Sequence, residues 1–196
     1  MSGSTQSLRW RTLGTGADAQ GLEHVELKIA ETGIAAEGVM GGGEGEAAHG
    51  LRWRITVDPD WTAFRSVHLT RLGGPTVALR HDGYGEWSDG EGKKRKEFQG
   101  LTDCIVVGSP FGPSQIVKRL GAKAAKTQTL AVVSVSLPDL VVERRTVKLE
   151  PQSGSGRLRL TVGETVTEVE IDADGFVTRF GEAVERVGGE VSTSAA

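Results

Sequence analysis

Apolar and polar residues alternate with a period of two along much of the chain. Within residues 22–30, Val25, Leu27 and Ile29 alternate with charged or polar residues, and residues 51–57 repeat this pattern more strictly. A helix would instead need apolar residues three and four positions apart, and these segments lack that spacing. The alternation therefore predicts β-strands that bury one face and expose the other.

Residues that favour turns divide this pattern into short segments. Asp82-Gly83 is a favoured hairpin dipeptide, because glycine accepts positive φ without strain, and Gly41-Gly42-Gly43 precedes a clear strand rather than a helix. Such spacing of strands and turns is typical of an antiparallel sandwich or barrel. The predicted strands are 8–13, 22–30, 34–40, 51–57, 61–72, 75–81, 84–87, 128–137, 140–149, 157–162, 165–171 and 176–180.

We therefore expect an all-β fold, a single antiparallel barrel-like or half-barrel domain with at most one or two short helices. The domain is predicted over residues 8–187, between a flexible N-terminus (1–7) and a flexible C-terminal tail (188–196). One short helix is expected over residues 114–120, with Ser114 as its N-cap. The 28 glycines of the 196-residue chain fit many short strands joined by turns.

Composition narrows the classes of protein to consider. The net charge of −3 argues against a broad nucleic-acid-binding surface. One cysteine allows no internal disulfide and fits a reducing compartment. Residues 1–11 lack the apolar region of a signal peptide, and no apolar run approaches the roughly 18 residues of a membrane span. We expect a cytoplasmic protein that does not insert into membranes.

No catalytic or metal-binding signature emerges from the residue types that usually carry chemistry. The four histidines and Cys104 do not share a metal-ligand spacing, so we predict no metal and no cofactor. Cys104 precedes Ile105-Val106-Val107 and is expected to pack as a small buried hydrophobe. Ser109 lies one position too early for a nucleophile elbow, and the proline after it disfavours that turn. We identify no catalytic residues, and whether the chain is an enzyme stays open.

The densest cluster of positive charge is Lys93–Lys96. One interpretation is a contact with anionic partners, which would make the chain an interaction module. The other is a solvated turn between strands, favoured because Glu91 and Glu97 flank the block and no aromatic residue interrupts it.

Trp53, Trp61 and Trp87 lie in or beside predicted strands. Trp53 falls on the apolar face of its strand, which indicates core packing. Trp61 and Trp87 flank turns and are candidates for the rim of a pocket. An indole ring suits either a sugar ring or an acyl chain.

A set of motifs occurs in order along most of the chain. They are Asp58-x-x-Trp61, Asp82-Gly83-x-Gly85-x-Trp87, Thr102–Val106, Ser109-Pro110-Phe111, Lys118-Arg119-Leu120, Leu137–Leu140 and Val169–Val177. Together they resemble the bacterial family catalogued as putative glycolipid-binding proteins, once a domain of unknown function. The central stretch 100–120 resembles the family's signature, although residues 112–117 depart from its usual loop by lacking an asparagine and placing a proline earlier.

The resemblance implies one all-β domain with a lined cavity like those of lipoprotein carriers, binding a glycolipid or another hydrophobic small molecule without catalysis. The ligand-binding residues we then expect are Trp61, Trp87, Phe111, Lys118 and Arg119. The aromatic residues would line or rim the cavity, and the basic pair would meet an anionic or sugar head group.

Other interpretations stay open. The basic pair also suits a surface ion pair or the C-terminal end of a helix. A small enzyme acting on a hydrophobic acid or ester in the same cavity would need a buried titratable group, for which His68 and His81 are candidates. The third alternative is the interaction module at Lys93–Lys96.

Overall fold

A computed structural model describes residues 3–13, 21–43, 45–154 and 156–194. In this part of the chain, 14 strands form one continuous sheet, in the order β7-β6-β5-β4-β3-β2-β1-β14-β13-β12-β11-β10-β9-β8. Its strands are β1 (Gly3–Thr12), β2 (Leu22–Ala30), β3 (Gly33–Gly42), β4 (His49–Val57), β5 (Phe64–Arg71), β6 (Thr76–His81), β7 (Trp87–Asp89), β8 (Cys104–Val106), β9 (Gln128–Ser136), β10 (Val141–Pro151), β11 (Arg157–Val162), β12 (Thr165–Ile171), β13 (Val177–Phe180) and β14 (Val184–Ser194).

The sheet is a meander in two halves that meet where the two ends of the chain pair. Every neighbouring pair is consecutive in sequence except β1 and β14, which are antiparallel over the whole length of β1. β8 and β9 form the parallel pair of the sheet. Strand pairing therefore extends into both segments that the sequence predicted to be flexible, because Gly3 pairs with Ser194 at the end of this ladder.

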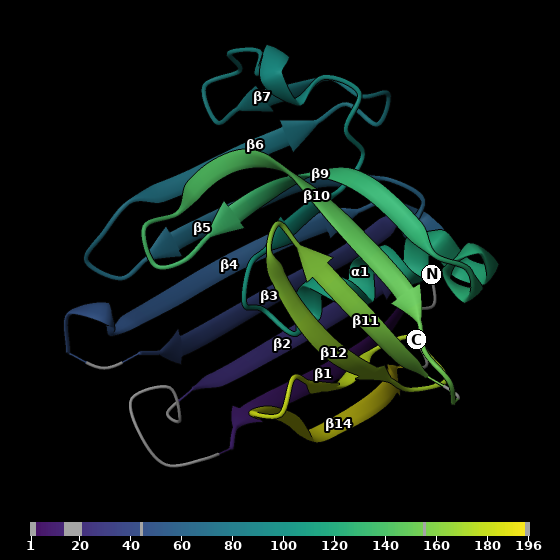
Figure 1. The fold of residues 1–196 in the computed structure, drawn as a ribbon. Helices are drawn as coiled ribbons and strands as arrows, with labels where there is room; N and C mark the ends of the chain where they lie inside the picture. The colour runs from purple at the N-terminus through teal and green to yellow at the C-terminus, as the bar shows by residue number, and fades with distance from the viewer. Residues whose placement is uncertain (1–2, 14–20, 44, 155, 195–196) are drawn as a thin grey trace.

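The sheet curves but does not close. Its two edges, β7 and β8, are successive strands in the chain yet are not hydrogen-bonded to each other. Figure 1 shows the sheet wrapping around the helix formed by residues 111–120. The expected all-β, barrel-like or half-barrel fold is confirmed, and the barrel is an open one. The predicted strands at 22–30, 157–162 and 165–171 match β2, β11 and β12 residue for residue.

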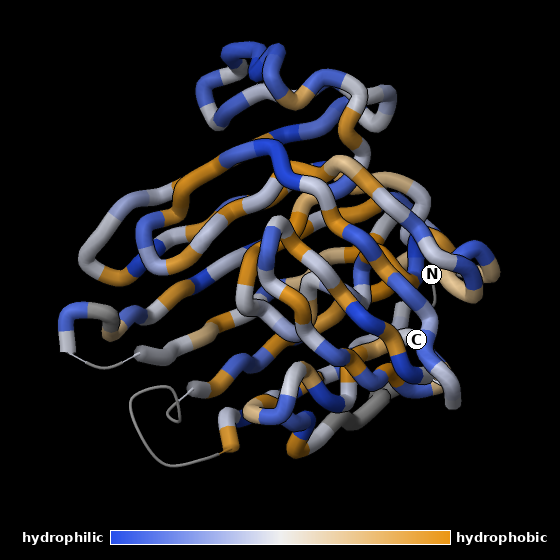
Figure 2. Tube along the Cα trace, viewed as in Figure 1, coloured by the Kyte–Doolittle hydropathy of each residue, from blue (hydrophilic) through white to orange (hydrophobic). Residues whose placement is uncertain are grey.

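Helix α1 (Phe111–Leu120) fills the concave side of the sheet. Most of its side chains are buried, from Phe111 at its start to Leu120 at its end. Phe111 joins an apolar cluster with strands of the first half, whereas Ile116, Val117 and Leu120 join a second cluster with strands β9 to β13. The helix thus bridges the two halves of the core, and the alternation of hydropathy along the strands around it is visible in Figure 2.

The start of this helix differs from the expectation. It begins at Phe111 with Pro110 at the N-cap position, so Ser114 lies inside the helix rather than before it. The buried Ser114 hydroxyl instead accepts a hydrogen bond of 3.0 Å from the Val177 backbone N–H in β13. The Ser114 hydroxyl therefore connects the helix to β13 instead of capping the helix. The structure also has short 3-10 turns. Gly45–Ala47 precedes β4, and Pro59–Trp61, which is η2, precedes β5. Lys96–Phe98 precedes β8, and Gly121–Ala125 follows α1.

Candidate functional site

The first candidate site is a pocket of about 510 Å³ at the C-terminal end of α1, which we call the Lys118 pocket. The turn η2 contributes Trp61, and the helix contributes Val117 and Lys118. Residues 151, 152, 154 and 156–158, around the connection from β10 to β11, and residues 171–175, at and after the end of β12, supply most of the remaining lining. Apolar side chains (Val117, Leu158, Ile171) and polar ones (Lys118, Arg157, Asp172, Asp174) share this lining.

Lys118 lies on two aromatic rings in this pocket. Its Nζ is 4.2 Å from the centre of the Phe176 ring and 5.3 Å from the centre of the Trp61 ring, within the range of a cation–π contact. Burial lowers the pKa of Lys118, and the nearby carboxylates of Asp174 and Asp172 oppose that decrease. The structure therefore presents a partly desolvated cation on an aromatic support.

The backbone around Trp61 is unusual. Asp60 and Trp61 have φ values of 58° and 61°, a left-handed conformation that is uncommon outside glycine. Arg65 stabilises this turn by donating two hydrogen bonds, of 2.5 and 2.6 Å, to the Asp58 carboxylate. The turn places the Trp61 ring 6.5 Å from Phe111 and 6.3 Å from Phe176. Strained backbone of this kind is often found at functional sites.

Three of the five predicted ligand-binding residues come together here. Trp61 and Lys118 line the pocket, and Phe111 lies behind Trp61, stacked on Trp53 at 5.3 Å. Trp53 is buried, as expected for a core residue. Phe176 was missed by the sequence analysis, although it follows the Asp-Ala-Asp-Gly turn within a recognised motif.

Arg119 and Trp87 lie outside this group. The Arg119 guanidinium donates two hydrogen bonds, of 2.6 and 2.7 Å, to the nearly buried carboxylate of Asp103. This is the ion pair that the sequence left open. Trp87 is buried beside Phe64 and His81, and its indole N–H donates to the Leu101 carbonyl oxygen at 2.8 Å. Neither residue lines the Lys118 pocket.

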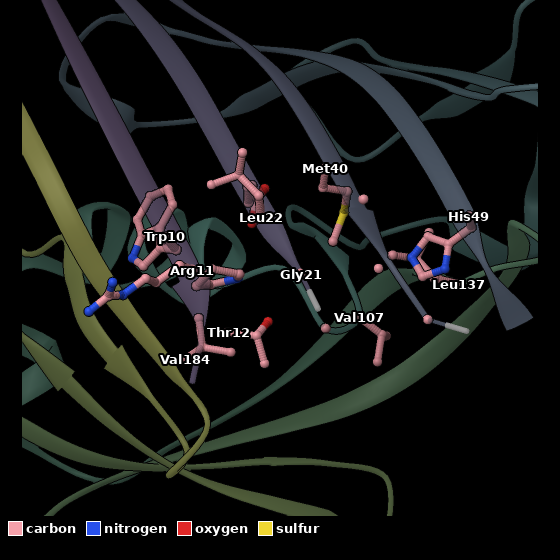
Figure 3. A pocket seen from close by; sticks show the side chains of 16 residues that line it. Trp10, Arg11, Thr12, Gly21, Leu22, Met40, His49, Val107, Leu137 and Val184 are labelled. Atoms are coloured by element: carbon pink, nitrogen blue, oxygen red, sulfur yellow. The ribbon is translucent and has the colours of Figure 1, made fainter. Parts of the chain in front are cut away.

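The second candidate site is a pocket of about 320 Å³ near the N-terminus of α1, which we call the Glu23 pocket. It shares no lining residue with the first. The ends of β1, β2 and β3 contribute Trp10, Glu23 and Met40, and the connection between β8 and α1 contributes residues 107, 108 and 110. Figure 3 shows Met40, Val107 and Val184 among the side chains arranged around this pocket.

Glu23 is a buried carboxyl group, with 3% of the residue exposed. The Ser109 hydroxyl donates to its two oxygens at 2.8 and 3.0 Å. Burial raises the pKa of Glu23 from 4.5 to about 7, despite the opposing effect of hydrogen-bond donors at Ser109, Trp53 and the Phe111 amide. The Trp53 indole nitrogen lies near the carboxyl without a partner at normal hydrogen-bond geometry. The site therefore holds a proton close to neutral pH.

The sequence contained a signal for Glu23 that was not used. In β2, Glu23 has the same parity as Val25 and Leu27, so the alternation that predicts the strand also places Glu23 on its buried face. A charged residue on such a face is expensive unless it is paired, which makes it a candidate for function. Ser109 gave no comparable signal, because its contact with Glu23 spans 86 residues.

The histidines considered for catalysis have other surroundings. His81 is buried, with Nδ1 2.8 Å from the Phe64 carbonyl oxygen and Nε2 accepting a hydrogen bond from the Gly85 amide at 3.0 Å. His68 is exposed on β5. Buried Cys104 matches its expected role as a small hydrophobe, and burial raises the pKa of its thiol. No group of three or more potential metal ligands occurs among the described residues.

The basic block Lys93–Lys96 is partly neutralised by its neighbours. Lys94 forms a 2.8 Å ion pair with Glu86, and Arg95 forms a 2.5 Å ion pair with Glu97 while lying over the Phe98 ring. Two members of the block thus have acidic partners within the protein. No helix in the described ranges is both long and apolar enough to cross a membrane.

Comparison with known proteins agrees with this architecture. The model of the family described as "Putative glycolipid-binding" matches residues 7–186. The chain belongs to this family. A search of curated proteins gives no match. Among solved structures, the chain is similar to a DUF1089 family protein from Pseudomonas aeruginosa, with 20% identity, a TM-score of 0.69, and coverage of 88% of this chain and 92% of that one. At this identity the likeness supports the fold alone.

Proposed function

We propose that this member of the glycolipid-binding family binds an amphipathic glycolipid in the Lys118 pocket, without catalysis. The observation that carries the proposal is the position of Lys118, whose ammonium group lies over Phe176 and Trp61 at the edge of a 510 Å³ pocket. Lys118 also belongs to the motif by which the sequence resembles the family, and the family match supports a glycolipid as ligand.

The lining of the pocket suits the two parts of such a ligand. Sugar hydroxyls donate hydrogen bonds to carboxylates and accept them from ammonium groups, so Asp172, Asp174 and Lys118 provide complementary partners. An acyl chain gains free energy by leaving water, and Val117, Leu158 and Ile171 provide apolar contacts. The sugar would lie toward the charged residues and the chain toward the apolar ones.

Lys118 would discriminate between ligands through its charge. Its partial burial strengthens an interaction with an acceptor relative to the same contact in water. Truncating the side chain while keeping its apolar part removes that interaction and leaves the aromatic rings in place. A glycolipid that carries an anionic group should therefore lose the most affinity.

The proposal is tested by titrating the protein with dispersed glycolipids and following tryptophan fluorescence, which is sensitive to changes at Trp61. Lys118→Met is expected to weaken binding by about tenfold, the loss of roughly one charge-assisted hydrogen bond. Lys123→Met is the matched control, because Lys123 is exposed in the next turn and does not line the pocket. Equal affinities for the two variants would contradict the proposal.

The enzyme alternative receives less support. It requires a carboxylate or a histidine inside the cavity. Both ring nitrogens of the candidate His81 contact backbone groups, and the buried Glu23 carboxyl belongs to a pocket separate from the Lys118 pocket. The interaction-module alternative is weakened by the ion pairs that Lys94 and Arg95 form with Glu86 and Glu97.

A further inference from the structure

We propose that the Glu23 pocket is a second binding site, which takes a small amphiphilic amine whose ammonium group pairs with the buried Glu23 carboxylate. This inference does not depend on glycolipid binding, since the two pockets have no lining residue in common.

The buried Glu23 carboxyl group can accept more hydrogen bonds than Ser109 supplies. It is nearly inaccessible to solvent, and no basic side chain forms an ion pair with it in the part of the chain that the structure describes. Its hydrogen-bond partner Ser109 supplies one proton, shared between two oxygens at 2.8 and 3.0 Å. A carboxylate has about four acceptor positions, so capacity for further donors remains.

The described groups around the Glu23 carboxyl supply dipoles rather than a positive charge paired with it. From β1, Arg11 lines the pocket but is bound to Glu185 at 2.7 Å. From β4, His49 lines the pocket and Trp53 approaches with its indole N–H. From the start of α1, Ser109 and the Phe111 amide contribute dipoles but no full positive charge. A cation from outside would provide the missing counter-charge.

The Glu23 pocket is small and largely apolar. Leu22, Met40, Val107, Leu137 and Val184 supply apolar surface, and the glycines at 41–43 and 108 contribute lining without side chains. A volume of about 320 Å³ suits a small molecule rather than a polymer. The combination of one buried acid with apolar walls fits an ammonium group attached to a short hydrocarbon chain.

The raised pKa of Glu23 supports the same conclusion and gives binding a measurable signature. Near pH 7 an appreciable fraction of free protein carries a protonated Glu23. An ammonium ion favours the charged carboxylate, so binding should release a proton. A neutral alcohol of equal length gains no such ion pair.

The test is isothermal titration calorimetry with hexylammonium and 1-hexanol as probes. The wild-type protein should bind hexylammonium more tightly by about tenfold or more, which corresponds to roughly 1.4 kcal/mol. Runs at pH 6 in two buffers of different ionisation enthalpy should reveal proton release. In Glu23→Gln the preference for the amine and the proton release should both disappear, whereas Lys118→Met should retain both.

A second variant guards against misfolding of Glu23→Gln. Met40→Trp places a larger side chain in the lining and so reduces the volume of the pocket, without changing Glu23 or Ser109. It should abolish binding of both probes. The proposal is overturned if the wild type binds the two probes equally or does not bind hexylammonium. It is also overturned if binding is unchanged in Met40→Trp or in folded Glu23→Gln. Loss of glycolipid binding in Lys118→Met with retention of hexylammonium binding would show that the sites are separate.

Discussion

The Ser109 hydroxyl donates a hydrogen bond to the buried Glu23 carboxyl group, with distances of 2.8 and 3.0 Å to its two oxygens. This contact joins β2 to the residue that precedes helix α1, and so connects the sheet to the helix that fills its concave side. It also gives the fold a dependence on pH that can be measured.

Stability should fall as pH rises through the range set by Glu23. The pKa of this group is about 7 in the folded protein against 4.5 for its ordinary value, so the folded state binds the proton more tightly. The stabilisation that comes from protonated Glu23 is complete below pH 4.5, and it is lost as the pH rises through about 7. By about pH 8 the loss should be on the order of 3 kcal/mol.

Chemical denaturation from pH 4.5 to 8 measures this effect. Glu23→Gln should flatten the pH dependence, because the amide does not titrate. Glu26→Gln, at an exposed position of the same strand, should retain it. If the two variants showed the same slope, Glu23 would not be the group responsible.

Arg119 is expected to act mainly through Asp103. Asp103 has 8% of its side chain exposed, and removing its partner leaves a nearly buried carboxylate without a counter-charge. Arg119→Met should therefore reduce the free energy of unfolding by about 3 kcal/mol. Arg159→Met, which breaks an exposed ion pair with Glu168, should cost much less, because water already solvates both side chains. Urea denaturation compares the two, and similar small losses would contradict a structural role for Arg119.

Trp87 should contribute to stability rather than to ligand affinity. Trp87→Phe keeps an aromatic ring beside Phe64 and His81 but removes the hydrogen bond to the Leu101 carbonyl oxygen. The expected loss is about 1–3 kcal/mol, since a buried acceptor is left unpaired. Glycolipid affinity, measured on the folded variant, should stay unchanged. A large loss of affinity without loss of stability would return Trp87 to the binding site.

Gly38 is required by the position of Trp53. A methyl group at Gly38 would lie 2.3 Å from two atoms of the Trp53 ring, which is stacked on Phe111. Gly38→Ala should cost about 1–3 kcal/mol by overpacking. Gly41→Ala on the same strand is the matched control, because its nearest neighbour would be at an ordinary 3.7 Å. Thermal unfolding of both variants checks this, and equal stability would show that the ring can move aside.

Local patterns in the sequence predicted the strands well and their assembly poorly. Alternation depends on each segment burying one face, so β2, β11 and β12 were predicted with their observed ends. The short strand β8 lacks alternation, because all three of its residues are buried. The pairing of β1 with β14 joins the two ends of the chain, and no local pattern reports such a distant contact.

The candidate site shows the same division. Trp61 and Lys118 were identified from motifs that resemble the family, and the structure places them together with Phe111 and the unexpected Phe176. Trp87 and Arg119 belong to motifs too, but in the fold their side chains donate hydrogen bonds to Leu101 and Asp103 and do not line the Lys118 pocket. A motif identifies a side chain, whereas only the tertiary structure shows what that side chain contacts.

Native mass spectrometry tests the central claim most directly. The protein is mixed with a glycolipid and, separately, with a lipid of the same acyl chains that lacks the sugar. The wild type and Lys123→Met should retain one glycolipid and little of the other lipid, while Lys118→Met should retain much less glycolipid than either. Failure of the wild type to retain glycolipid, or equal retention in the two lysine variants, would contradict glycolipid binding at the Lys118 pocket.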